Sequence, residues 1–109
     1  MPKKPSKRDE FRKKNDNEGT GHPTYIYAKI GNKFKYIGMT HSEITNGVKN
    51  IKLDKNPNPE DEKDSYMHPM PQKADAGRFG KKLRGWKLAE SDKPKVEAIK
   101  SKKKKSDNN

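Results

Sequence analysis

A cluster of basic side chains near the C-terminal end of the chain could hold the phosphates of a nucleic acid. Lysine and arginine bind phosphate oxygens through their charge, which gives affinity without reading the base sequence. An ordinary solvated helix face has a similar composition. The cluster comprises Arg78, Lys81, Lys82, Arg84 and Lys87, with Trp86 among them, and Lys29, Lys33 and Lys35 would extend its surface. We predict nucleic-acid binding at these residues.

His41 is the single residue for which the sequence suggests catalysis. Ser42 follows it directly, and Lys35 and Lys52 are close in the sequence. In RNA cleavage without a metal ion, a histidine can act as general base while a lysine stabilises the charge on the phosphorane. Adjacent residues of a strand point to opposite sides, so the pair by itself does not define a site. The other two histidines, His22 and His68, fall in predicted loops.

Other kinds of functional site find little support. The chain has no cysteine, which excludes thiolate zinc sites and cysteine nucleophiles. Its three histidines are scattered, and the acidic residues between 54 and 64 lack EF-hand spacing. Phosphate-binding loop, dinucleotide-binding and nucleophile-elbow sequences are also missing. We therefore predict no metal and no cofactor.

The overall charge points to an anionic partner. The chain has 109 residues, a net charge of +12 and 39% charged residues. Such a balance favours nucleic acid, DNA or RNA, ahead of an acidic membrane surface. The leading hypothesis is a small basic nucleic-acid-binding protein. A metal-independent, toxin-like endoribonuclease using His41 and an adaptor with a protein partner are the alternatives.

The element on which the fold depends is a hairpin over residues 24–40. Gly31-Asn32 separates two runs of aromatic and β-branched residues, and glycine suits the first position of a type II′ turn. A two-residue loop would set Tyr27 opposite Tyr36. One face would then carry Tyr25, Tyr27, Lys29, Phe34 and Tyr36, and the other Ile26, Ala28, Ile30, Ile37 and Met39.

The tyrosine face of this hairpin has two interpretations. Exposed, it would be a platform on which single-stranded bases stack. Buried, it would be part of the core, which the general burial preferences of aromatic residues favour.

Shorter patterns predict the remaining elements. Thr40 and Glu43 have capping-box spacing, which predicts a short helix or a structured loop ending near Gly47. We expect a third strand over 48–53, a loop over 54–64 and a short edge strand over 65–70. A helix over 78–84, a brief strand over 86–89 and a helix from Lys93 to about Lys102, with Val96 and Ile99 inward, complete the prediction.

These elements predict a small α+β fold. A small antiparallel sheet or partial β-barrel of roughly three to five strands, built on the hairpin, would pack against a short helix and a C-terminal helix. Only 26% of the residues are hydrophobic, so we expect a disordered basic arm over 1–22, one α+β domain over 23–100 and a Lys-rich tail over 101–109. No secretory signal or membrane span is predicted, which indicates a cytoplasmic protein whose oligomeric state stays open.

Overall fold

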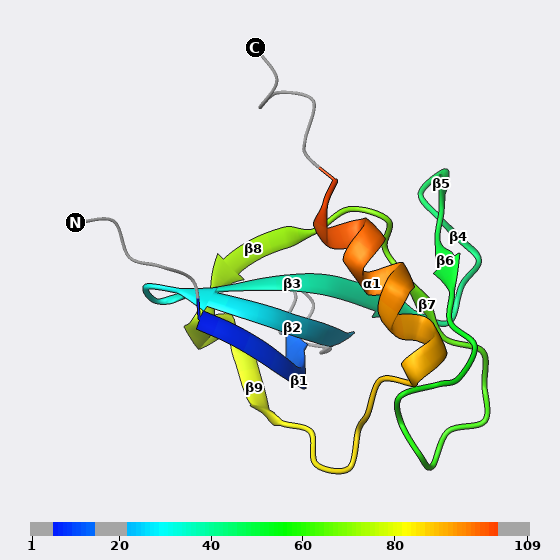
Figure 1. The fold of residues 1–109 in the computed structure, drawn as a ribbon, viewed down its shortest axis with the longest axis horizontal. Helices are drawn as coiled ribbons and strands as arrows, with labels where there is room; N and C mark the ends of the chain where they lie inside the picture. The colour runs from blue at the N-terminus through cyan, green and yellow to red at the C-terminus, as the bar shows by residue number, and fades with distance from the viewer. Residues whose placement is uncertain (1–5, 15–21, 103–109) are drawn as a thin grey trace.

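The structure is a computed structural model that describes residues 6–14 and 22–102 (Figure 1). Three long strands lie at its centre: β1 (Ser6–Lys14), β2 (His22–Ile30) and β3 (Lys33–Thr40). The shorter strands are β4 (Ile44–Thr45), β5 (Val48–Lys49), β6 (Ile51–Lys52), β7 (Tyr66–Met67), β8 (Gln72–Asp75) and β9 (Phe79–Lys82). Two 3₁₀ turns, η1 (Ala76–Arg78) and η2 (Glu90–Asp92), precede β9 and the helix α1 (Lys93–Lys100), respectively.

The main sheet is antiparallel and curls into a partial barrel. Its order is β6-β7-β3-β2-β1-β9, and β8 pairs with β3 beside β7. Strands β8 and β9 lie on opposite sides of the β1–β2–β3 meander, although only the three residues of η1 separate them in the chain. The sheet must therefore bend round to bring its two sides together (Figure 1). The predicted α+β class and partial barrel are confirmed, with more strands than we expected.

A β-bulge changes the register of the central hairpin. Near the turn the pairing is as predicted, with Ile30 opposite Lys33 and Gly31 at φ 59°. The register then shifts between Ile26 and Ala28, so Ile26 rather than Tyr27 lies opposite Tyr36. An extra residue in one strand reverses the faces of everything beyond it. The predicted five-residue aromatic face is therefore wrong.

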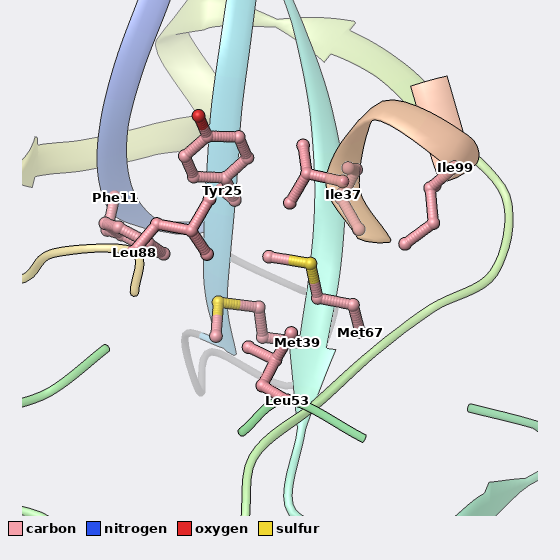
Figure 2. Packing of buried hydrophobic residues seen from close by; sticks show 9 residues of the cluster. Phe11, Tyr25, Ile37, Met39, Leu53, Met67, Leu88 and Ile99 are labelled. Atoms are coloured by element: carbon pink, nitrogen blue, oxygen red, sulfur yellow. The ribbon is translucent and has the colours of Figure 1, made fainter. Parts of the chain in front are cut away.

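The bulge distributes the aromatic residues between two cores, one on each face of the sheet. The larger core packs α1 against the sheet and contains Phe11, Tyr25, Ile37, Met39, Leu53, Met67, Leu88, Val96 and Ile99 (Figure 2). The smaller core contains Ile26, Phe34, Tyr36 and Phe79. Tyr25 and Tyr36 are only 6% and 5% exposed, so they are core residues and not an open stacking platform. Tyr27 is partly buried beside the larger core.

Strand β1 lies where the composition predicts a disordered arm. Its one large apolar side chain, Phe11, is 1% exposed and has its ring centroid 5.1 Å from that of Tyr25 and 5.7 Å from that of Trp86. On the other face, Glu10 is buried between Arg8 and Arg12, which hold its pKa below the usual value despite the opposing effect of burial. For residues 6–14 the arm prediction is wrong. Residues 1–5 and 15–21, and the tail from 103 onward, lie outside the described residues.

The segment after residue 76 differs from the prediction in its first half. Residues 78–84 do not form a helix: β9 pairs with β1, and Phe79 enters the smaller core. Residues 86–89 do not form a strand. The predicted C-terminal helix is confirmed as α1, with Val96 and Ile99 buried.

The segment after Thr40, predicted as a short helix or a structured loop, contains two short strands and no helix. Strands β4 and β5 form a separate hairpin whose turn has Asn46 at φ 50° and Gly47 at φ 78°. This is the Asn-Gly combination that type I′ turns need. The predicted third strand is interrupted at Asn50 into β5 and β6, and β7 lies between β3 and β6 rather than at an edge. Within residues 6–14 and 22–102, no helix is long and apolar enough to cross a membrane.

A fully buried carboxylate ties α1 to the loop that follows β6. Asp92 accepts hydrogen bonds from the backbone N–H of Asp54 at 2.7 Å and of Lys55 at 3.2 Å. The Lys95 ammonium group lies 3.0 Å from the same side chain. This carboxylate therefore fixes the start of α1 against residues 54–55.

We predict that Asp92→Ala lowers the free energy of unfolding by about 2–3 kcal/mol, because two backbone donors and an ammonium group lose a charged acceptor. Urea unfolding followed by circular dichroism measures the change. Asp64→Ala is the matched control, since Asp64 forms only an exposed 3.6 Å pair with Lys52 and should change stability by less than about 0.5 kcal/mol. Equal effects of the two substitutions would contradict the role of Asp92.

Candidate active site

Two adjoining cavities lie at the end of β3, and each of the three histidines lines at least one of them. The larger, of about 430 Å³, is here called the histidine cavity and is lined by residues that include Lys13, His22, His41, Ser42, Asp61 and Trp86. The smaller, of about 280 Å³, is called the amide cavity because Asn50 and Gln72 line it, together with Lys14, Tyr36, Thr45 and His68 among others. His22, Pro23, Met39 and Thr40 line both cavities.

Strand pairing brings these distant residues together. Thr24 pairs with Gly38, which places His22, at the start of β2, close to the end of β3 and hence to His41. On the other side of β3, Met67 pairs with Met39, and the N–H of His68 donates to the carbonyl oxygen of Gly38 at 2.8 Å. Three histidines that the sequence scatters over 47 positions therefore share one end of the sheet.

His41 is held by a carboxylate from the loop between β6 and β7. Its Nε2 lies 3.0 Å from Oδ2 of Asp61, whose Oδ1 accepts the N–H of Lys63 at 3.0 Å. The backbone N–H of Lys63, followed by the contact with His41, lowers the pKa of Asp61. An ionised carboxylate only accepts hydrogen bonds, so Nε2 carries the proton and Nδ1 is the basic nitrogen. This arrangement suits a general base, since Asp61 stabilises the imidazolium that forms.

His68 is held differently. Its Nδ1 accepts the backbone N–H of Met70 at 3.2 Å, and no carboxylate contact to its ring occurs among the hydrogen bonds of the described residues. The two histidines therefore differ in their surroundings: His41 is oriented by a carboxylate, whereas His68 is fixed to its own loop.

The end of β1 supplies one cation to each cavity. Lys13 lines the histidine cavity and Lys14 lines the amide cavity, because neighbouring residues of a strand point to opposite faces. The Lys14 ammonium group also lies 5.9 Å from the ring centroid of Tyr36. Sequence reasoning missed both lysines, since it placed them in the arm.

Two residues of the predicted basic cluster lie on the edge strand β9, and the other three lie just before or after it. Lys81 and Lys82 are exposed on β9, which borders β1, and Arg12 pairs in register with Lys82. Arg78 is exposed in η1. Arg84 and Lys87 are exposed in the following segment, where the N–H of Lys87 donates to the carbonyl oxygen of Pro57.

The predicted hairpin lysines lie towards the turn that joins β2 to β3, at the opposite end of β3 from the histidine cavity. Lys33 sits at the β2–β3 turn, paired with Asp75 at 3.1 Å, and the seven residue steps along β3 separate it from Thr40 by roughly 23 Å. Lys35 pairs in register with Lys73 on β8. The Lys29 ammonium group lies 5.8 Å from the ring centroid of Phe34, a residue of the smaller core. Arg8 and Arg12 also approach this ring. The structure therefore does not bring Lys29, Lys33 and Lys35 together with His41.

Nothing in the described ranges, 6–14 and 22–102, groups three His, Asp or Glu side chains as metal ligands. Comparison with protein-family models, with curated proteins and with solved structures finds no match for this chain.

Proposed function

We propose that the protein binds RNA and cleaves it at the histidine cavity without a metal ion. The observation that carries this proposal is the gathering of His22, His41 and Lys13 on one cavity, with His41 oriented by the ionised Asp61. These are the groups that transesterification of RNA requires: a base, an acid and a cation near the phosphate.

Each group has one task in the proposed reaction. Nδ1 of His41 takes the proton of the ribose 2′-hydroxyl, and the 2′-oxygen attacks the adjacent phosphorus. The bond from phosphorus to the 5′-oxygen of the next nucleotide breaks, and that oxygen takes a proton from protonated His22. Lys13 stabilises the charge that develops on the phosphorane oxygens. The products are a 2′,3′-cyclic phosphate and a 5′-hydroxyl, so the step needs no water or co-reactant.

The exposed cations near the cavity support binding of a polyanion. Strand β9, with Lys81 and Lys82, lies next to the strand that ends in Lys13 and Lys14. A single strand that crosses this edge would meet cations before its backbone reaches His41. Binding of nucleic acid without cleavage is the second candidate function, favoured by the exposed position of these same lysines.

The test of cleavage is incubation of the protein with a single-stranded RNA in EDTA. We expect shorter products to accumulate, and the corresponding DNA to stay intact because it lacks the 2′-hydroxyl. Intact RNA together with a salt-dependent complex would reject cleavage and leave the second candidate. Intact RNA and no complex at low salt would reject both.

We predict that replacing Lys81 and Lys82 together by glutamine weakens binding of a non-cleavable single-stranded DNA and makes it less dependent on salt. Each phosphate contact of a single strand contributes about 0.7 to the slope of log K against log salt, so the slope should fall by about 1.4. Fluorescence anisotropy over a salt series measures it. Lys33→Gln is the control, because Lys33 is paired with Asp75 at the far end of the hairpin and should leave the slope unchanged.

A further inference from the structure

The amide cavity lies beside the proposed cleavage site and has the size and lining of a site for one planar ring. It shares His22, Pro23, Met39 and Thr40 with the histidine cavity. Its volume of about 280 Å³ is just below the range of pockets that hold drug-sized ligands, about 300–1,000 Å³. Tyr36 and Met39 supply aromatic and apolar surface, and Lys14 contributes a cation. A ligand here would have a flat apolar body and a nearby negative charge.

One side chain of this cavity has an unused hydrogen-bonding atom. Asn50 is 5% exposed, and its Nδ2 donates to the carbonyl oxygen of Ser42 at 3.0 Å and to Oγ1 of Thr45 at 2.9 Å. A carbonyl oxygen only accepts, so the amide cannot be flipped. Its Oδ1 is buried without a hydrogen-bond partner in the described part of the chain. A buried acceptor without a partner costs about 1–3 kcal/mol, which a ligand that donates to it would recover.

The segment that holds this amide lies outside both hydrophobic cores. Every residue from His41 to Lys49 is exposed, including Ile44 at 58% and Val48 on the β4–β5 hairpin.

A second amide in the cavity is oriented by a tyrosine. The Tyr36 hydroxyl donates to Oε1 of Gln72 at 3.0 Å, which leaves the NH₂ end of Gln72 as the donor end. The cavity thus combines an acceptor, Asn50 Oδ1, with a donor, the NH₂ group of Gln72. A donor and an acceptor on the edge of one flat ring are characteristic of nucleobases.

We propose that the amide cavity binds the base of the nucleotide on the 5′ side of the cleaved bond and that Asn50 and Gln72 select this base. The inference rests on the proposed function, because it assigns this cavity to the RNA cut at the histidine cavity. His22, on the wall between the cavities, would then lie beside the phosphate that joins the bound nucleotide to the next.

Binding of the four 2′-deoxynucleoside 3′-monophosphates tests this assignment, because these ligands carry base and phosphate but cannot be cleaved. Isothermal titration of the full chain should show one base bound at least tenfold more tightly than inorganic phosphate. The same base should stand 5′ of the bonds cut in RNA. Gln72→Leu and, separately, Thr45→Val, which alters the exposed segment that holds the Asn50 amide, should each weaken the preferred nucleotide by about tenfold. Lys73→Gln, the exposed neighbour of Gln72 on β8, should not.

The outcomes separate this inference from the proposed function. Nucleotides bound no better than phosphate, or bound equally by wild type and Gln72→Leu, would overturn the base site even if RNA is cleaved. Selective nucleotide binding by a protein that leaves RNA intact would support the base site and reject cleavage.

Discussion

Replacing His41 with alanine is expected to slow RNA cleavage by about 10²- to 10⁴-fold, the contribution typical of a positioned general base. Asp61→Asn should slow cleavage by about 10- to 100-fold, because it replaces the charged acceptor of the His41 hydrogen bond by a neutral amide. A hydrogen bond to a charged group contributes about 1.5–3 kcal/mol. Single-turnover rates at saturating protein measure both effects on the chemical step.

Glu43→Gln is the matched control for these substitutions. Glu43 lies two residues after His41 in the same exposed segment, and its structural contact is the backbone carbonyl oxygen that accepts the N–H of Asn50. Its rate should match that of the wild type. A His41→Ala rate within threefold of the wild-type rate would remove His41 from the reaction, even if RNA is cleaved.

Replacing Phe11 with alanine is expected to lower the free energy of unfolding by about 3–5 kcal/mol, a large share of the stability of a small domain. The side chain is fully buried between the rings of Tyr25 and Trp86, so its removal leaves a cavity beside both. Urea unfolding followed by circular dichroism measures the change.

Ile44→Ala is the control for Phe11, since Ile44 is the most exposed large apolar side chain of the described residues. It should change stability by less than about 0.5 kcal/mol. If Phe11→Ala lowered the free energy of unfolding as little as Ile44→Ala does, β1 would not be part of the folded unit. Lys13 and Lys14, which lie on β1, would then not line the two cavities.

The parts of the fold that could be predicted depend on local signals. The Gly31 turn and helix α1 have such signals: a glycine at a turn position that needs positive φ, a proline in the first helical turn, and Val96 and Ile99 on one face. Strand β1 has a weaker one, because every residue from 7 to 14 except Phe11 is charged, and that ring is buried only by contacts with distant residues such as Tyr25 and Trp86. The bulge beside Tyr27 has no signal in the sequence, and it decided which aromatic residues share a face.

The candidate site was predicted only in part, because residues distant in the sequence come together in it only through the fold. His41 could be recognised as a chemical group, but Asp61 lies 20 residues away in a loop predicted only as a solvated, acidic segment. The separation of Lys33 and Lys35 from His41 follows from the length of β3. Asn46-Gly47 is the one missed signal that was available, since it is typical of the tight turn that joins β4 to β5.

The central claim is attack by the 2′-hydroxyl at the histidine cavity, and end-group analysis tests it most directly. The substrate is an RNA oligonucleotide with a single 2′-deoxy nucleotide placed 5′ of a bond that the wild-type protein cuts, and the reaction contains EDTA. We predict that this bond stays intact, while the same bond in the all-ribose oligonucleotide yields a 2′,3′-cyclic phosphate and a 5′-hydroxyl. Cleavage at the deoxy position, or products with 5′-phosphates, would contradict the account.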